Sequence, residues 1–576
     1  MSKTAGKIFD RYPVQYASLN ASALRTVSIL AAPGMLAACG GGGGGGGAGF
    51  VSTQNAETVP VNDPLPTPQA ASGLPASYTP PVSTYVAPAA PGPNRFVLQT
   101  EFVDPYWVAA LRSENFEQVT STLAGADKTI AYAFPETQPD FYDGLAEAAG
   151  WQPANAEIRS AYADIFASLE AILDVRFVQT NDAAADNVIS ISRVDPADPT
   201  TGGYAFFPSD ATTLGSDILI SVDFDNPVQN ADGSTNFDYE VLVHELGHAL
   251  GLKHPFEADG VNTETLPALE DSSVLTTMSY DFISAAYDGE FRIFDLVALT
   301  EAYGVNPEFR AGDDVYALSA ERAVFVIDGA GSDTISAAGL SDPVTIDLRD
   351  GERSHIGTEA QLISSAGQLA ISPNSVIENA IGGSGNDLLT GNDVANRLDG
   401  GAGNDRLFAG EGSDIIVGGT GDDIIDLSEL VAATDTVVFD VSQTGLGADQ
   451  IFSFQQGAGG DVIDIISETF ADLLDVVSAN NVPQASVQGN ILRLTDAALQ
   501  TAEQVRDVFS EGGAFENLDL ALGGDAIVIA ADTQNTGDDQ RLFHVEQNET
   551  VLDVTLLATV SGNYLDIDNW QAGNFA

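Results

Sequence analysis

The chain has 576 residues, and its 21 Lys and Arg against 83 Asp and Glu give a formal net charge of −62. A negative field of this size repels phosphate, which argues against a nucleic-acid binder and against a protein of anionic membrane surfaces. Hydrophobic residues nevertheless make up 44% and charged residues only 18%, whereas acidic disordered chains combine low hydrophobicity with many charges. We therefore expect most of the chain to fold, over several domains.

Residues 1–39 are typical of a signal segment, because four basic side chains precede a short apolar stretch that a proline interrupts. This stretch is too short to span a bilayer as a stable helix. Residues 36–39 also resemble the box of bacterial lipoproteins, which ends at a lipidated cysteine, and Cys39 is the only cysteine of the chain. Two interpretations stay open: a lipid anchor at Cys39, or an ordinary signal segment in which this cysteine is incidental.

A linker and a mixed α/β region follow the signal segment. Residues 40–95 begin with a run of glycines and continue with many prolines, which predicts a disordered, extended linker without a core. Residues 96–125 are either a propeptide or the start of the next domain, which we place at 126–315. Hydrophobic periodicity in that domain predicts a helix over 154–173 and strands over 128–134, 175–180, 187–194 and 217–224.

The pattern H-E-x-x-H-x-x-G-x-x-H begins at His244. On a helix, His244 and His248 lie one turn apart on the same face, so both imidazoles can reach one ion. Gly251 lets the backbone leave the helix at positive φ, so that His254 returns as the third ligand. Three imidazoles without a thiolate suit a catalytic zinc ion with an open position for water. Glu245 is then placed to take a proton from that water.

This pattern resembles that of the metzincin zinc metallopeptidases, and Pro255 after the third histidine is similar to their serralysin branch. Residues 276–280 resemble the Met-turn of that branch. The resemblance implies that Met278 forms a hydrophobic floor under the zinc ion. It also implies that the Tyr280 hydroxyl ligates the resting metal and later stabilises the tetrahedral intermediate. Residues 202–208 then include the edge strand to which a peptide substrate adds, with an ordinary surface hairpin as the alternative.

Five consecutive nine-residue units rich in Gly and Asp cover residues 382–426, and an isolated unit covers 328–336. Such units form a parallel β-roll, in which backbone carbonyls and aspartates bind Ca²⁺ and the apolar residue at position eight points inward. The expected inward side chains are Leu389, Leu398, Leu407, Ile416 and Ile425. The expected calcium ligands are Asp333, Asp387, Asp405, Asp414 and Asp423.

Two units complete one turn of a roll, so units one, three and five stack on one edge and units two and four on the other. The second unit has Asn396 at the acidic position and Val394 in place of its third glycine. We therefore predict a complete row of calcium ligands on the first edge and a defective row on the second. The roll and its cap are placed at 316–470, and a β-rich C-terminal region at 471–576, where the resemblance implies a signal for a type I exporter.

Together these features predict a multidomain protein, with an α/β metzincin-like catalytic domain, a parallel β-roll and a β-rich C-terminal region. The predicted function is a secreted or cell-surface bacterial zinc endopeptidase with protein or peptide substrates and structural calcium. It leaves the cell by type I export or by lipoprotein processing, has no nucleic-acid partner, and contacts the membrane only through a lipid on Cys39. Two alternatives are a calcium-binding adhesion protein without proteolysis, and a peptidase held latent by residues 96–125.

Overall fold

The computed structural model describes residues 105–466, except 115, 144–149, 184, 186, 197–200, 209–214, 231–232, 259–261, 282–287 and 457–459. Beyond Ile466 it describes residues 474–477, 491–494, 501–509, 525–531, 540–548, 551–561 and 574. The expected signal segment with Cys39 and the expected linker lie outside the described residues. Among the described helices, none is both long and apolar enough to cross a membrane. The chain divides between Asn306 and Pro307 into two compact units, each treated by itself below.

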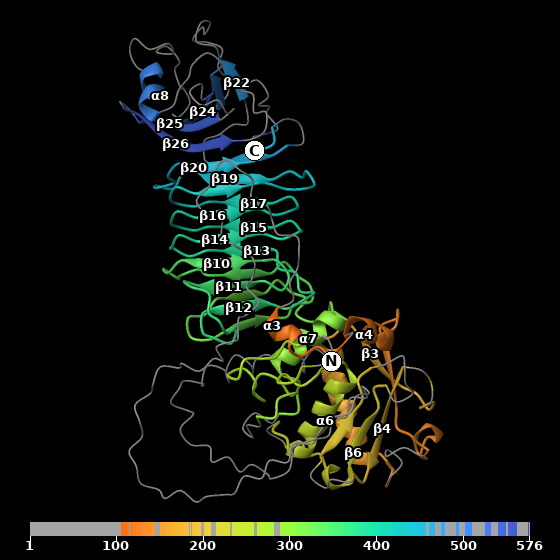
Figure 1. The fold of residues 1–576 in the computed structure, drawn as a ribbon. Helices are drawn as coiled ribbons and strands as arrows, with labels where there is room; N and C mark the ends of the chain where they lie inside the picture. Colours follow the sequence, from red (N-terminus) through yellow and green to blue (C-terminus); the bar gives the residue numbers. More distant parts are fainter. Residues whose placement is uncertain are drawn as a thin grey trace, which may run out of the picture. The chain divides into compact units, whose positions relative to one another are not determined.

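A mostly parallel sheet forms the centre of the first unit, with the strand order β3-β1-β4-β6-β5 (Figure 1). The inner strands β4 and β6 are buried at nearly every position, as parallel strands covered on both faces require. β5 runs antiparallel to β6 at the end of the order, and the short β2 pairs with β4. The strands are β1 (Thr129–Ala133), β2 (Gln152–Pro153), β3 (Arg176–Gln179), β4 (Val188–Val194), β5 (Gly203–Ala205) and β6 (Ile218–Ser221).

Three longer helices accompany this sheet: α5 (Ala156–Glu170), α6 (Phe237–Ala249) and α7 (Ile293–Tyr303). The side chain of Asn155 caps α5, and that of Asn236 caps α6, each by accepting a hydrogen bond from a backbone N–H of the first turn. The strand predicted over 217–224 ends at Ser221 and continues as the short 3-10 helix η4 (Val222–Phe224). The Ser221 hydroxyl accepts a hydrogen bond from the backbone N–H of Asp223, which turns the chain out of the strand.

The described part of residues 96–125 packs within this first unit. It forms α3 (Tyr106–Ala109) and α4 (Phe116–Ala124), while η2 (Asp140–Tyr142) follows β1. The Trp107 side chain is only 2% exposed. The backbone N–H of Lys253 donates to the Leu111 carbonyl at 2.8 Å, and that of Ser113 donates to the Gly251 carbonyl at 3.1 Å. The segment therefore contacts the chain that carries the predicted third zinc ligand.

The second unit is a roll of short strands stacked in two sheets (Figure 1). Strands from alternate nine-residue units pair in parallel, so Leu389, Leu407 and Ile425 align in one sheet. Leu398 and Ile416 align in the other. The smaller sheet contains β7 (Val315–Ala317), β9 (Thr334–Ser336), β13 (Asn379–Ile381), β15 (Arg397–Asp399), β17 (Ile415–Val417), β19 (Thr436–Asp440) and β21 (Val462–Ile466).

The larger sheet contains the remaining strands of the roll and the C-terminal strands. The roll supplies β8 (Val324–Val326), β10 (Val344–Asp347), β11 (Arg353–Ile356), β12 (Gln368–Ile371), β14 (Leu388–Thr390), β16 (Arg406–Phe408), β18 (Ile424–Asp426) and β20 (Asp449–Phe452). The C-terminal region supplies β22 (Leu474–Val477), β23 (Ile491–Leu494), β24 (Asp525–Ala531), β25 (Gln540–Asn548) and β26 (Val551–Ser561), and also forms α8 (Ala502–Phe509). Because β26 pairs in parallel with β20, the C-terminal strands continue the sheet of the roll.

The core of the roll consists of the apolar residues that the repeat places inward. All five predicted inward side chains have no exposed surface and belong to one hydrophobic cluster. The glycines of the turns allow close stacking of successive coils. A Cβ atom on Gly419, where φ is +103°, would come within 2.0 Å of the Gly401 carbonyl oxygen. A side chain at this position is therefore excluded both by the backbone conformation and by the neighbouring coil.

Candidate metal centre

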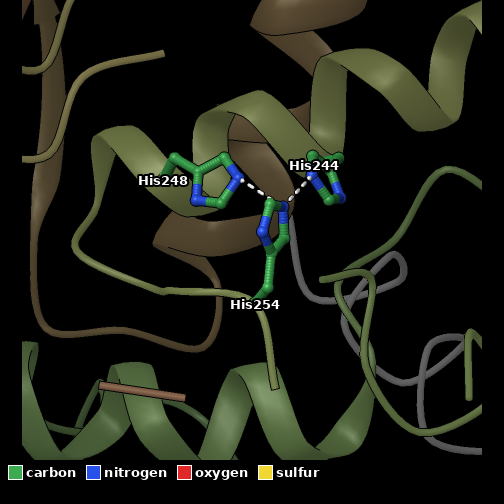
Figure 2. Close-up of side chains that lie close together, drawn as sticks. All are labelled: His244, His248 and His254. Carbon is green, nitrogen blue, oxygen red and sulfur yellow. Dashed lines mark hydrogen bonds between the residues drawn. The ribbon is translucent and has the colours of Figure 1, made fainter. Parts of the chain in front are cut away.

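The end of α6 places three histidines around one point (Figure 2). His244 and His248 lie on the same face of α6, and Gly251 adopts a φ of +105° directly after the helix. The backbone N–H of Leu252 donates to the Gly247 carbonyl at 2.8 Å, which closes the helix end and reverses the chain. His254 therefore returns towards α6, and its side chain is buried like the other two.

The Nε2 atoms of the three imidazoles face one another. His254 Nε2 lies 3.2 Å from His248 Nε2 and 3.3 Å from His244 Nε2 (Figure 2). The outer nitrogens of the two helical histidines contact carbonyl oxygens: His244 Nδ1 is 2.8 Å from Thr277 O, and His248 Nδ1 is 2.7 Å from Leu252 O. A carbonyl only accepts, so each of these Nδ1 atoms carries the proton and each Nε2 presents a lone pair. Converging lone pairs repel unless a cation lies between them, so this donor set fits a zinc ion.

Burial keeps the helical histidines in the form that binds metal. It lowers the pKa of His244 to about 3 and the pKa of His248 well below its usual value, and the neighbouring His254 adds to both shifts. Both imidazoles are therefore neutral near neutral pH. His254 Nδ1 lies 3.0 Å from Glu257 Oε2. The hydrogen bond between them lowers the pKa of the Glu257 carboxyl.

Glu245 is a residue of α6 whose side chain faces the edge strand β5, and it is 3% exposed. A Cβ atom on Gly203 of β5 would lie 3.1 Å from Glu245 Cγ and 3.3 Å from its Oε1, so β5 passes directly against this side chain. The Phe207 ring, just beyond β5, lies edge-on to His248 with 5.6 Å between the ring centroids. The predicted general base, a predicted ligand and the predicted edge strand therefore lie together. The sequence analysis did not predict that Gly203 allows this close approach to Glu245. The pair Gly202-Gly203 was the signal that could have indicated it.

Met278 packs against α6 at Gly247, the residue before His248. It has no exposed surface, and a Cβ atom on Gly247 would come within 2.5 Å of its Sδ atom. The ring of Tyr280 lies close to two of the imidazoles, with centroids 4.6 Å from His254 and 5.8 Å from His244. The structure thus brings both predicted residues of the Met-turn to the histidine cluster. It also shows why α6 carries glycine at position 247.

Asp295 fixes the Met-turn from α7, a role that the sequence analysis missed. Its Oδ2 accepts hydrogen bonds from the backbone N–H of Thr277 at 2.7 Å and from the Thr277 hydroxyl at 2.9 Å. Its Oδ1 accepts from the Thr276 hydroxyl at 2.6 Å. Burial raises the pKa of the Asp295 carboxyl, and four hydrogen bonds oppose this shift. The signal that could have indicated this role is that Asp295 is the single carboxylate in the apolar sequence 293–299 at the start of α7.

The five predicted aspartates of the roll are buried, and all of them except Asp333 stack in two rows, one on each edge. On one edge, the backbone N–H of each aspartate donates to Oδ1 of the next, which links Asp387, Asp405, Asp423 and Asp449. On the other edge, the same contacts link Asn396, Asp414, Asp435 and Asp461. The sequence analysis missed Asp435, Asp449 and Asp461. Their signal was an acid at the first position of a strand or directly before it, outside the nine-residue repeats.

Several of these carboxylates have one buried oxygen without a hydrogen-bond partner: Oδ2 of Asp333, Asp405, Asp414 and Asp423. Burial raises the pKa of Asp405 and of Asp414 to about 7 and that of Asp423 to about 6. Carboxylate oxygens of Asp314, Asp328 and Asp333 also lie within 4.8 Å of one another. Oxygen ligands gathered in this way fit the coordination that Ca²⁺ prefers.

Asn396 differs from these aspartates because its side chain has a partner for each polar atom. Its Oδ1 accepts a hydrogen bond from the backbone N–H of Asn392 at 2.7 Å. Its Nδ2 donates to the Glu378 carbonyl at 3.1 Å and to Asn392 Oδ1 at 3.0 Å. The hydrogen bonds of the Asn396 amide therefore satisfy all its polar atoms without a cation. This is the position at which the sequence predicted a defect in the row of calcium ligands.

Two family models match the chain: Matrixin over residues 147–287, and Peptidase M10 serralysin C terminal over residues 298–485. Together, these two matches support a serralysin-type M10 metallopeptidase. Serralysin C of Dickeya chrysanthemi is 33% identical over 215 residues, covering 33% of this chain and 43% of that protein. Serralysin of Proteus mirabilis is 29% identical over 262 residues, covering 38% and 52%. Serralysin of Photorhabdus sp. (strain Az29) is 29% identical over 299 residues, covering 46% and 59%.

The matched regions of this serralysin-type chain include the parts that carry the described sites. The Matrixin match contains the three histidines and the Met-turn, and the serralysin match contains all five consecutive repeats. The chain spans about half the length of the curated relatives it matches. The three histidines within the first match offer ligand atoms within 4.8 Å of one another, so this cluster could hold one metal ion.

Proposed function

We propose that this chain is a bacterial zinc endopeptidase that hydrolyses peptide bonds of proteins outside the cytoplasm. The observation that carries the proposal is the convergence of three Nε2 lone pairs beside the buried Glu245 carboxylate and the edge strand β5. A metal site alone would suit a structural role. A metal site with a neighbouring carboxylate and an edge strand suits hydrolysis of an extended peptide.

In this mechanism each side chain of the centre has one task. A bound zinc ion supplies a Lewis acid that polarises the scissile carbonyl and lowers the pKa of water. β5 holds the substrate backbone as an added strand, beside Glu245. Glu245 accepts the proton of the attacking water and later delivers it to the leaving amine. Tyr280 stabilises the oxyanion of the tetrahedral intermediate by a hydrogen bond from its hydroxyl.

We further propose that calcium stabilises the roll. The support is the set of buried carboxylate oxygens without hydrogen-bond partners in the two rows and in the cluster of Asp314, Asp328 and Asp333. The same aspartates account for part of the net charge of −62. In a cytosol poor in calcium they would repel one another, whereas the calcium outside the cell would neutralise them and favour folding.

For the route out of the cell we propose either type I export or lipoprotein processing, with Cys39 as the anchor in the second case. Mass spectrometry of the mature protein from cells and from medium separates the two. A diacylglyceryl group on an N-terminal Cys39 supports the anchor, whereas an unprocessed Met1 in the medium supports type I export. The described segment 105–124 is proposed to remain in the mature enzyme, because it packs against the chain around Gly251 and Lys253.

The substitution Glu245→Gln tests the enzymatic proposal. It removes the general base but leaves the three histidines, so casein hydrolysis should fall by at least about 100-fold while zinc binding remains stoichiometric. The matched control is Glu136→Gln, which changes an exposed carboxylate that pairs with Arg159 and should leave hydrolysis unchanged. Undiminished hydrolysis by the Glu245→Gln variant would contradict the assignment.

A further inference from the structure

The third histidine is oriented differently from the first two. The outer nitrogens of His244 and His248 contact backbone carbonyls, which no substitution of a side chain removes. The outer nitrogen of His254 instead contacts the carboxylate of Glu257, at 3.0 Å. The Glu257 side chain is 61% exposed, whereas that of His254 is 5% exposed. The orientation of this one imidazole therefore depends on a charged side chain at the surface.

A second side chain holds the same imidazole from its face. The ring of Phe256 stacks on that of His254 with 5.1 Å between centroids and an angle of 6° between planes. The Phe256 ring also lies 5.1 Å from the ring of Tyr280. The His254 and Tyr280 centroids are themselves 4.6 Å apart, so the three rings form one cluster in which Phe256 contacts both of the others. Rotation of the His254 ring about its own axis would break the stacking with Phe256 and the hydrogen bond with Glu257 together.

The backbone that carries these two side chains is fixed by a buried lysine. Lys253 is 2% exposed, and its ammonium donates hydrogen bonds to three separate segments. They are the carbonyls of Ala110 at 2.7 Å, Glu257 at 2.6 Å and Glu264 at 2.8 Å. Because Lys253 holds the Glu257 carbonyl, the backbone that carries the exposed Glu257 carboxylate is fixed.

We propose that Phe256 and Glu257 form a bracket that fixes the His254 imidazole and thereby controls how long the centre retains zinc. The proposal rests on the proposed function, since it concerns the same zinc ion. The carboxylate holds the proton on Nδ1 and makes Nε2 a better electron donor towards the metal. The stacked ring holds the imidazole plane in the orientation in which Nε2 faces the other two ligands. Both residues are positioning residues.

The experiment measures zinc release from the full chain. Zinc-loaded protein is mixed with an excess of a chromogenic chelator, and the release rate is followed by absorbance. Loss of a partner that orients a metal-bound histidine weakens metal binding by about 10- to 100-fold. We therefore expect Glu257→Ala to release zinc about 10- to 100-fold faster than the wild type. Glu257→Gln should be affected less, because its amide oxygen still accepts the hydrogen bond.

The stacking contact is tested in the same way. Phe256→Ala should release zinc faster than Phe256→Leu, which keeps most of the apolar volume. After substitution with Co²⁺, the visible spectrum of Glu257→Ala and of Phe256→Ala should differ from that of the wild type, because the ligand field changes. The control Glu136→Gln removes a carboxylate of similar exposure, 73%, and should change neither measurement.

The results of these measurements distinguish a failure of the bracket from a failure of the proposed function. Unchanged zinc release from all four variants, in a chain that holds zinc and keeps its unfolding temperature, would overturn the bracket alone. A wild-type chain that binds no zinc would overturn the proposed function and the bracket together. The conservative variants Glu257→Gln and Phe256→Leu keep the test decisive if an alanine variant does not fold.

Discussion

The carboxylate of Asp295 accepts a hydrogen bond from the backbone N–H of Thr277 at 2.7 Å, across 18 positions of sequence. The carbonyl of the same Thr277 accepts the hydrogen bond from His244 Nδ1 at 2.8 Å. A residue of α7 therefore orients the first predicted zinc ligand on α6 through the backbone of a single residue, Thr277. Asp295 touches no ligand itself, but displacement of Thr277 would turn the imidazole of His244.

We expect Asp295→Asn to destabilise the first unit and to weaken zinc binding. Both carboxylate oxygens accept hydrogen bonds, so an amide nitrogen at either position would face a donor. Leaving a buried donor unpaired costs about 1–3 kcal/mol. Urea unfolding and zinc titration measure the two effects. The control Asp174→Asn removes an exposed ion pair with Lys128 and should change the stability by less than about 0.5 kcal/mol; equal effects of both variants would contradict this role.

We expect Gly247→Ala to disturb the packing of α6 on Met278. The added Cβ would lie 2.5 Å from Met278 Sδ, so the thioether must move. Overpacking of this kind costs about 1–3 kcal/mol, and the better helix propensity of alanine offsets about 1 kcal/mol of it. A double-mutant cycle with Met278→Ala separates the two effects. Because truncation of Met278 removes the clash, the two substitutions should couple by at least about 0.5 kcal/mol, and strictly additive effects would contradict the contact.

The parts of the site that the sequence predicted are those fixed by local geometry. The spacing of His244, His248 and His254 follows from one helical turn and one glycine reversal, so their convergence could be predicted without knowledge of the fold. In the same way, the nine-residue period placed Leu389 and its equivalents inside the roll. Boundaries were less accurate, because the strand over 217–224 ends where Ser221 captures a backbone N–H.

The parts that the sequence did not reveal depend on contacts between distant segments. Neither the closeness of Gly203 to Glu245 nor that of Asp295 to Thr277 leaves a pattern at a fixed spacing. In the regular repeats, linked acids are 18 positions apart, as from Asp405 to Asp423. The next link on that edge, from Asp423, spans 26 positions, so the row continues where the repeat is no longer visible in the sequence.

We expect Asn396→Asp to create an additional calcium site. The substitution removes the two hydrogen bonds that the amide nitrogen donates and places a second carboxylate oxygen at the same point. Calcium titration should then give one more bound ion per chain, and the chelated variant should be less stable than the chelated wild type by about 1–3 kcal/mol. The control Asn404→Asp adds the same charge at an exposed position of the same roll. An unchanged calcium stoichiometry would contradict the prediction.

The stability of the calcium-free roll should fall as the pH rises. Burial raises the pKa of Asp405 and of Asp414 to about 7, and that of Asp435 and of Asp449 to about 8. Unfolded aspartate has a pKa near 4, so between about pH 4 and pH 8 the folded roll binds more protons than the unfolded chain. Stability from these groups is therefore fully present below about pH 4 and is lost as the pH rises through the folded pKa values.

Thermal unfolding of the second unit, followed by circular dichroism with a chelator at several pH values, measures this loss. Excess Ca²⁺ should reverse the trend, because the ion stabilises the ionised carboxylates and competes with their protons. Asp405→Asn and Asp414→Asn remove two of the titrating groups, so the double variant should show a weaker pH dependence in chelator than the wild type. If the chelated wild type is as stable at pH 8 as at pH 5, the buried carboxylates are paired with some group other than a proton or calcium.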